Sequence, residues 1–329
     1  MNISLKIFKR DVTRGYDYSS NVKDITYTTY RSGAASSFTC DIIGLSDEVE
    51  CGYWLLCDID GKRVFSGYIF KISIDKHGIA NVLAYDQLRY LKTNHSYAFT
   101  GQSADEIVRK IANDFVLSVG ELESVPYKIP SLVCEDTSLF DIIEEALVQT
   151  TNHTGLIYVF YDDYGELKLK QASLLQKNKI IGDLSASEYF YKSDIDQQTY
   201  NQIRLVKPNE QTGKADVIIV NDSSTINKWG LLQLYEKVDQ HSNEAQMKQS
   251  AETRLKYYNR VLETIDLQNI IGDLDVRAGV MIPIKIEKLS KFRNPYWLIC
   301  EKVVHKINGN VHMMDISCNI LSNVFYTNG

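Results

Sequence analysis

Two histidines near the end of the chain form the pair most suited to bind a metal ion. A two-residue turn at Asn308-Gly309 would place His305 and His312 directly opposite each other on neighbouring strands. A zinc site uses at least three protein ligands, and only Glu301 or Asp315 lies near in the sequence. We therefore expect a solvent-facing pair of histidines that holds neither a metal ion nor another cofactor.

A second candidate is a short acidic segment that also contains an arginine. Asp273, Asp275 and Arg277 lie within the seven residues that end at Gly279. Charges at this spacing suit an internal ion pair or a contact with a partner protein. We expect the structural use here. We also expect residues 162–165 to form a hairpin turn, because they lack the alternating acidic ligands of a calcium loop.

The sequence lacks the motifs by which the common enzyme classes are recognised. It has no nucleophile elbow, no phosphate-binding loop, no dinucleotide-binding glycine motif and no zinc-protease helix motif. The 42 acidic residues leave a carboxylate pair for glycoside hydrolysis open, because that reaction needs only two of them at a suitable separation. No pair is marked by its spacing, so we expect no enzymatic activity and assign no catalytic residue.

The composition is that of a globular protein with more than one core. At 329 residues the chain is long enough for two or three packed units, and only 18 Gly and 5 Pro argue against disorder. The net charge of -6 argues against a nucleic-acid-binding surface, which requires clustered Lys and Arg. The sequence has no apolar run of the roughly 20 residues that a membrane span requires, and no signal peptide. We expect a protein made in the cytoplasm, with six reduced cysteines.

Residues 1–85 show the alternating pattern of antiparallel strands. Asp60-Gly61 and residues 75–78 are turn signals between successive strands. Six or more short strands indicate a small barrel or a sandwich, and closure would remove exposed strand edges. The expected strands are residues 4–8, 24–30, 37–42, 53–59, 62–68, 68–74 and 79–83.

The alternating pattern gives way to a helical one at residues 82–92. Asp86 is placed to cap the new helix, and Leu88 and Leu91 fall on one of its faces. Asp86 and Arg89 could be mistaken for a catalytic pair, but a cap and a helix-surface contact explain both charges. Further helices are expected from residues 103 and 138, followed by a hairpin, so residues 86–195 should form a compact α+β domain.

Strands return from residue 196 and are interrupted by one long helix at residues 243–259. The hairpins at residues 65–83 and 297–320 resemble each other, which suggests a weak internal repeat with one β unit at each end of the chain. We expect Trp54, Trp229 and Trp297 to lie in the cores, with protein interfaces as the alternative.

Four segments, in their order and spacing, give the chain a resemblance to a known family. It resembles the tail hub proteins of contractile phage tails, in particular the PBSX-type prophage hub family. The segments are Val64-Phe65-Ser66-Gly67-Tyr68-Ile69, Ala84-Tyr85-Asp86-Gln87-Leu88-Arg89-Tyr90-Leu91, Lys228-Trp229-Gly230-Leu231-Leu232-Gln233 running into Glu236-Lys237-Val238-Asp239, and Gly272-Asp273-Leu274-Asp275-Val276-Arg277-Ala278-Gly279.

The resemblance implies a mainly β, α+β chain with two tail-tube-like antiparallel β-barrels and an inserted α+β domain. The domains would be residues 1–85, 86–195 and 196–329, with the helix at 243–259 flanking the second barrel. A homotrimer would present six barrels in a pseudo-six-fold ring that joins the hexameric tail tube to the trimeric spike. The other implied partners are the tape measure and baseplate wedge proteins, and DNA would only pass through the lumen.

The residues expected to be structural or to contact partners come from the same segments. They are Tyr85, Asp86, Arg89, Trp229, Asp273, Asp275, Arg277 and Gly279. Two other functions stay open: a cell-wall hydrolase component of the same baseplate, and a receptor- or glycan-binding tail module. A phage and a headless bacteriocin share such a hub, so the particle into which the protein assembles also stays open.

Overall fold

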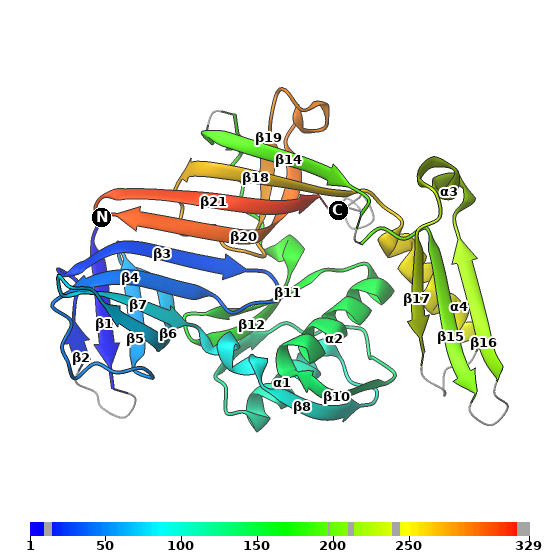
Figure 1. Cartoon of the computed structure of the whole chain (residues 1–329), viewed down its shortest axis with the longest axis horizontal. Coiled ribbons are helices and arrows are strands. Elements are labelled where there is room, and N and C mark those ends of the chain that lie inside the picture. The colour runs from blue at the N-terminus through cyan, green and yellow to red at the C-terminus, as the bar shows by residue number, and fades with distance from the viewer. Residues whose placement is uncertain (10–14, 184, 197, 210–213, 239–243, 321–329) are drawn as a thin grey trace. The chain divides into compact units, whose positions relative to one another are not determined.

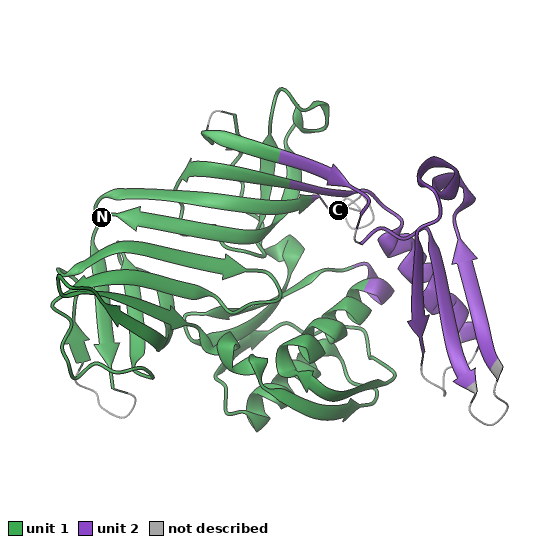
Figure 2. Ribbon diagram, in the orientation of Figure 1, with its two compact units in different colours: residues 1–151, 156–190, 265–319 green, residues 152–155, 191–264, 320–329 purple. Residues whose placement is uncertain are grey.

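The computed structural model describes the chain except for residues 10–14, 184, 197, 210–213, 239–243 and 321–329 (Figure 1). The chain divides into two compact units (Figure 2). The larger unit contains residues 1–151, 156–190 and 265–319, and the smaller unit contains residues 152–155, 191–264 and 320–329. These units cut across the expected domain of residues 196–329, and the division into three domains stays a prediction.

The first seven strands lie side by side and are all antiparallel. Their alternating side chains, including Leu5, Phe38 and Phe65, form a buried core. The predicted turn at Asp60-Gly61 is confirmed, because Ile59 pairs with Lys62 and both turn residues have positive φ. The strands are β1 (Ile3–Phe8), β2 (Gly15–Asp17), β3 (Val22–Tyr30), β4 (Ser37–Ile43), β5 (Trp54–Ile59), β6 (Lys62–Ile74) and β7 (Ile79–Tyr85).

Strands that follow residue 180 extend this same sheet, because β20 pairs with β3 along six residue pairs. The added strands are β13 (Ile181–Gly182), β14 (Glu188–Asp194), β18 (Leu262–Ile271), β19 (Met281–Lys285), β20 (Tyr296–Asn308) and β21 (Val311–Ile320). Two of them, β13 and β14, lie within the expected insert of residues 86–195. A short helix, η3 (Ser290–Phe292), lies between β19 and β20.

The two expected β segments therefore form one sheet of 13 strands. Within the described ranges, no ladder closes either segment into a barrel, so the expectation of two barrels is not confirmed. The mainly β character with helices is confirmed. The alternating sequence pattern predicts where strands form. It does not predict which strands pair, and the β3–β20 ladder joins residues more than 270 positions apart.

The predicted α+β segment between β7 and β13 has its own core. The capping box at the start of α1 is present, with Glu106 accepting a hydrogen bond from the Ser103 amide at 2.9 Å. Leu139, Ile142 and Ala146 of α2 are buried, as their spacing predicts. The elements are η1 (Gln87–Lys92), β8 (Asn94–Phe99), α1 (Ala104–Asp114), β9 (Val119–Leu122), β10 (Leu132–Ser138), α2 (Leu139–Thr154), β11 (Tyr158–Asp163), β12 (Glu166–Gln171) and η2 (Ala172–Leu174).

The smaller unit contains a separate three-stranded sheet with a helix on one face. Strand β15 (Gln202–Asn209) lies between antiparallel β16 (Lys214–Asn221) and parallel β17 (Gln233–Lys237). Helix α3 (Ser223–Trp229) connects β16 to β17, and α4 (Glu244–Tyr258) packs on β15 and β16. The long helix is thus present and covers this sheet, whereas we expected it to flank a barrel formed by all of residues 196–329. Its expected first residue, 243, lies outside the described residues.

The expectation that the tryptophans fill the cores is wrong. Trp54 is exposed, and Trp229 and Trp297 are half-buried. The Trp54 indole donates a hydrogen bond to the Ser66 hydroxyl at 2.9 Å, which gives its polar atom a partner beside solvent.

Candidate functional site

The loop between β18 and β19, residues 272–280, lies where several elements of the larger unit meet, and we call it the junction loop. Both ends are fixed on the β20–β21 hairpin. The Gly272 amide donates to the His312 carbonyl at 2.8 Å, and the Gly279 amide donates to the Cys300 carbonyl at 2.7 Å. This loop contains four of the eight predicted site residues.

Gly279 holds the junction loop close to β11. Its φ is +88°, and a Cβ at this position would lie 2.3 Å from Val159 Cγ1. Both the left-handed backbone and the close approach exclude a larger residue. The amide of the preceding residue, Ala278, donates a hydrogen bond to the Thr29 hydroxyl of β3 at 2.9 Å. The loop therefore contacts β3 and β11 at neighbouring residues.

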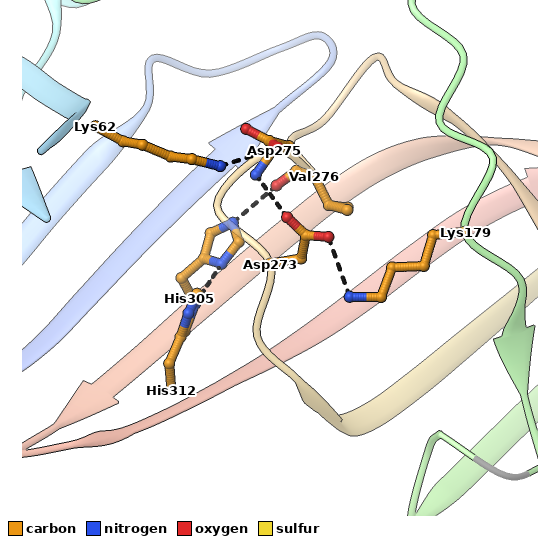
Figure 3. Close-up of polar contacts among 7 residues, drawn as sticks. All are labelled: Lys62, Lys179, Asp273, Asp275, Val276, His305 and His312. Carbon is orange, nitrogen blue, oxygen red and sulfur yellow. Dashed lines mark hydrogen bonds and ion pairs between the residues drawn. The ribbon is translucent and has the colours of Figure 1, made fainter. Parts of the chain in front are cut away.

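Two lysines fix the acidic part of the junction loop (Figure 3). Asp273 pairs with Lys179 at 3.0 Å, and Asp275 pairs with Lys62 of β6 at 3.0 Å. Burial opposes ionisation of Asp273, but the Asp275 amide and the Lys179 ammonium outweigh it and hold the pKa of Asp273 below its usual value. Both ion pairs are partly exposed, so they add little to the stability of the fold and mainly hold the junction loop in place.

His305 lies at the centre of this arrangement and not in solvent, which corrects our prediction (Figure 3). It is 1% exposed, and its Nε2 lies 2.8 Å from the Val276 carbonyl. A carbonyl only accepts, so Nε2 carries the hydrogen. Nδ1, which lies 2.9 Å from His312 Nε2, must then accept from His312. Both tautomers are fixed by these partners, and Tyr27 stacks on the His305 ring.

The two histidines are diagonal neighbours, whereas we predicted a directly opposed pair. Asn308 pairs with Val311, so the turn is Gly309-Asn310, and His305 pairs with Met314. Burial and the neighbouring His312 lower the pKa of His305 to about 4. Both nitrogens of His305 are occupied, and the described residues contain no group of three or more potential metal ligands. The arrangement is a hydrogen-bonded structural pair.

Arg277 extends from the junction loop to the end of β11. Its Nη1 donates to the Asp162 carbonyl at 2.9 Å, and its guanidinium carbon lies 4.1 Å from the centroid of the Tyr161 ring. An arginine stacked on an aromatic face and bonded to a carbonyl is strongly fixed in orientation. Arg277 is therefore the side chain that ties the junction loop to the β11–β12 hairpin.

The predicted residues at the end of β7 lie beside the same hairpin. Asp86 is 2% exposed, and its carboxylate accepts from the amides of Leu88 and Ser36, both at 3.1 Å. It thus caps η1, as its position before a helical pattern predicts. The Arg89 guanidinium lies 5.4 Å from the Phe70 ring and 6.0 Å from the Tyr85 ring.

Asp162, which we predicted only as a turn residue, lies between Arg277 and the residues at the end of β7. It accepts from the Gln87 side chain and from the Gly165 amide, both at 2.8 Å. Burial, followed by the charge of Asp162, raises the pKa of Asp86 to about 8. Burial also raises the pKa of Asp162 to about 6, against the effect of its hydrogen bonds and of Arg277. Two buried acids beside one arginine form a polar core between the sheet and the insert.

Trp229 is not part of this site. It ends α3 in the smaller unit, where the Lys228 ammonium lies 5.6 Å from its ring.

None of the helices in the described ranges is long and apolar enough to span a membrane.

A family model described as YQBQ-like matches residues 25–319. The chain belongs to the YQBQ-like family. It is 32% identical over 259 residues to the Phage-like element PBSX protein XkdQ of Bacillus subtilis (strain 168), and the match covers 78% of each chain. The resemblance to the PBSX-type prophage family is thus confirmed.

Solved structures show the same fold at low sequence identity. The 43 kDa tail protein of prophage MuSo2 from Shewanella oneidensis gives a TM-score of 0.67 at 13% identity, covering 97% of this chain and 98% of that chain. A tail protein from Neisseria meningitidis MC58 gives 0.68 at 12% identity, covering 97% of each. The c3393 protein of E. coli, a type VI secretion component described as similar to the T4 tail proteins gp27 and gp5, gives 0.55 at 11% identity, with 98% and 78% covered.

Proposed function

We propose that this chain is a structural hub subunit in the tail of a phage or a phage-tail-like particle. The observation that carries the proposal is the match of 97% of the chain to the folds of a prophage tail protein and a second tail protein. The sequence relative from a phage-like element supports the same role. The likeness to a protein described as similar to T4 tail proteins supports a place in the tail.

In the proposed particle, three copies form a ring between the six-fold tail tube and the three-fold spike. The strands β1–β7 and β18–β21 would each supply one tube-like barrel face, which gives six per trimer. The β3–β20 ladder supports this arrangement, because it makes both faces of one subunit a continuous sheet. The two barrels, the three domains, and the contacts with tape measure and wedge proteins belong to this proposal.

We assign the chain no catalytic role and no cofactor. The buried carboxylates of Asp86 and Asp162 accept hydrogen bonds from the chain itself. Their partners are amides and a glutamine side chain that hold the junction of the sheet with the insert. This use of the acidic residues favours a structural role over that of a cell-wall hydrolase.

Deletion of the gene in the producing strain tests the proposal. We expect induced cells to release no particles with assembled tubes, and we expect the wild-type gene on a plasmid to restore them. Normal particles from the deletion strain would contradict the hub role. A zymogram of the purified protein distinguishes the hub from a cell-wall hydrolase. A hydrolase would produce a band of lysis in the gel, and we expect no such band.

A further inference from the structure

The three-stranded sheet of the smaller unit has one covered and one open face. Ile203 and Leu205 of β15 are buried against Met247 and Ala251 of α4. Figure 1 shows α4 against one side of β15–β17 only. By the alternation of strand residues, the other face presents Gln202, Arg204, Val217, Ile219, Asn221, Gln233, Tyr235 and Lys237, while Val206 on the same face is buried. We call this set the open face.

The open face is apolar at its centre. Val217, Ile219 and Tyr235 are 39%, 49% and 52% exposed. Register places Ile219, Arg204 and Tyr235 in one row across the three strands, and the Arg204 guanidinium lies 5.9 Å from the Tyr235 ring. Adjacent exposed apolar side chains of this size indicate a binding surface.

The charged side chains of the open face, Arg204 and Lys237, are both basic. The acidic residues on these strands alternate to the other face, where Asp216 pairs with Lys207 and Glu236 pairs with Arg254. The open face therefore fits a partner that offers carboxylates around exposed apolar residues.

The larger unit carries a surface with this composition. The sequence contains no Lys or Arg between Lys128 and Lys168. Within that stretch, α2 exposes Val148 by 40%. Asp141 and Glu145 of the same helix are exposed, and with Val148 they follow the i, i+4, i+7 spacing that places side chains on one helix face. We call this set the acidic surface.

We propose that the open face of one copy binds the acidic surface of a neighbouring copy. This inference rests on the proposed ring and names the two surfaces that meet in it. Because the surfaces differ, each copy can use one of them toward each neighbour, which is the kind of contact from which a cyclic ring is built. The apolar residues lose water in the contact, while Arg204 and Lys237 approach carboxylates, which fixes the orientation of the two copies.

Sedimentation of the full chain over a range of concentrations tests the proposal. We expect Ile219→Ser to weaken self-association about tenfold, since it removes apolar area from the contact. Lys237→Glu and Glu145→Lys should each weaken association, and their double variant should recover part of the loss because the two charges are exchanged. Ile74→Ser is the matched control, an isoleucine 61% exposed on β6 of the larger unit, and should leave association unchanged.

The outcomes separate this inference from the proposed function. If the wild type forms trimers and the three open-face and acidic-surface variants do the same, the contact uses other surfaces and the inference is wrong, while the hub role stands. A wild type that stays monomeric at about 100 µM also overturns the inference, and the gene deletion then decides the hub role. Unchanged unfolding temperatures of the variants are required, so that weaker association is not a consequence of misfolding.

Discussion

Arg277 of the junction loop donates a hydrogen bond to the main-chain carbonyl of Asp162, 115 residues away in the sequence, at a distance of 2.9 Å. This contact joins the strands at the end of the chain to the inserted α+β segment. The charge of the same Asp162 contributes to the raised pKa of Asp86, which follows β7 directly. The three parts that the sequence pattern separates are thus tied together by one polar cluster.

Arg277→Ala should lower the free energy of unfolding by about 2–3 kcal/mol, because it removes a charged hydrogen bond to the Asp162 carbonyl and the stacking on Tyr161. Lys62→Ala removes an exposed ion pair from the same loop and should cost no more than about 0.5 kcal/mol. Urea unfolding of both variants measures the difference. Equal effects would show that the contact with Asp162 does not anchor the loop.

Gly279→Ala should be one of the most damaging changes in the chain, at about 3 kcal/mol or more, because it combines positive φ with a clash against Val159. Gly309→Ala is the control, since its φ is also positive but no atom lies within 4 Å of the added Cβ, and about 1 kcal/mol is expected. Val159→Ala combined with Gly279→Ala should recover the part due to the clash. A Gly279→Ala variant as stable as Gly309→Ala would contradict the close approach.

The contribution of Asp86 to stability should fall as the pH rises from about 4 toward 8. The folded pKa of Asp86, about 8, exceeds its ordinary value of 3.8, so the folded state holds a proton that the unfolded state has released over this interval. Asp86→Asn keeps a neutral side chain at every pH. It should therefore reduce the loss of unfolding free energy between about pH 4 and pH 8 by at least about 1 kcal/mol. Unfolding temperatures of both proteins between pH 5 and pH 9 give the test, and parallel curves would exclude Asp86 as the source.

The contribution of His305 to stability should fall as the pH drops from 6.5 to about 4. The folded pKa of His305 lies below its ordinary value, so the unfolded state binds the proton first and is favoured. His305→Gln removes the titrating group, so the wild type should lose stability relative to this variant as the pH falls over this interval. If the two profiles run parallel from pH 7 to pH 4, another group controls the acid limb.

Local sequence signals predict local structure well in this chain. The Asp60-Gly61 turn, the capping box at Ser103 and the Asp86 cap are each set by residues a few positions apart, and all three are present. The partner of β3 and the burial of His305 depend on strands from opposite ends of the chain. A one-residue difference in the β20–β21 turn was enough to make the two histidines diagonal, because register sets every cross-strand neighbour.

Sequence signals predict the part of the candidate site whose residues are close in the sequence. Asp273, Asp275, Arg277 and Gly279 are close in the sequence, and their loop is where the elements meet. Asp162 and Gln87 were not singled out, because each looks like a turn or helix residue until Arg277 and Asp86 are placed beside them. Asp162 is distinguished by its burial beside Gln87 and Arg277, which the local pattern of a hairpin turn does not reveal.

The most direct test of the hub role is a reconstruction of the particle that this protein enters. We expect three copies in a ring between tail tube and spike, with the tube stacked on the strands of the larger unit. A different copy number at that position, or density for the chain away from the tube–spike junction, would contradict it.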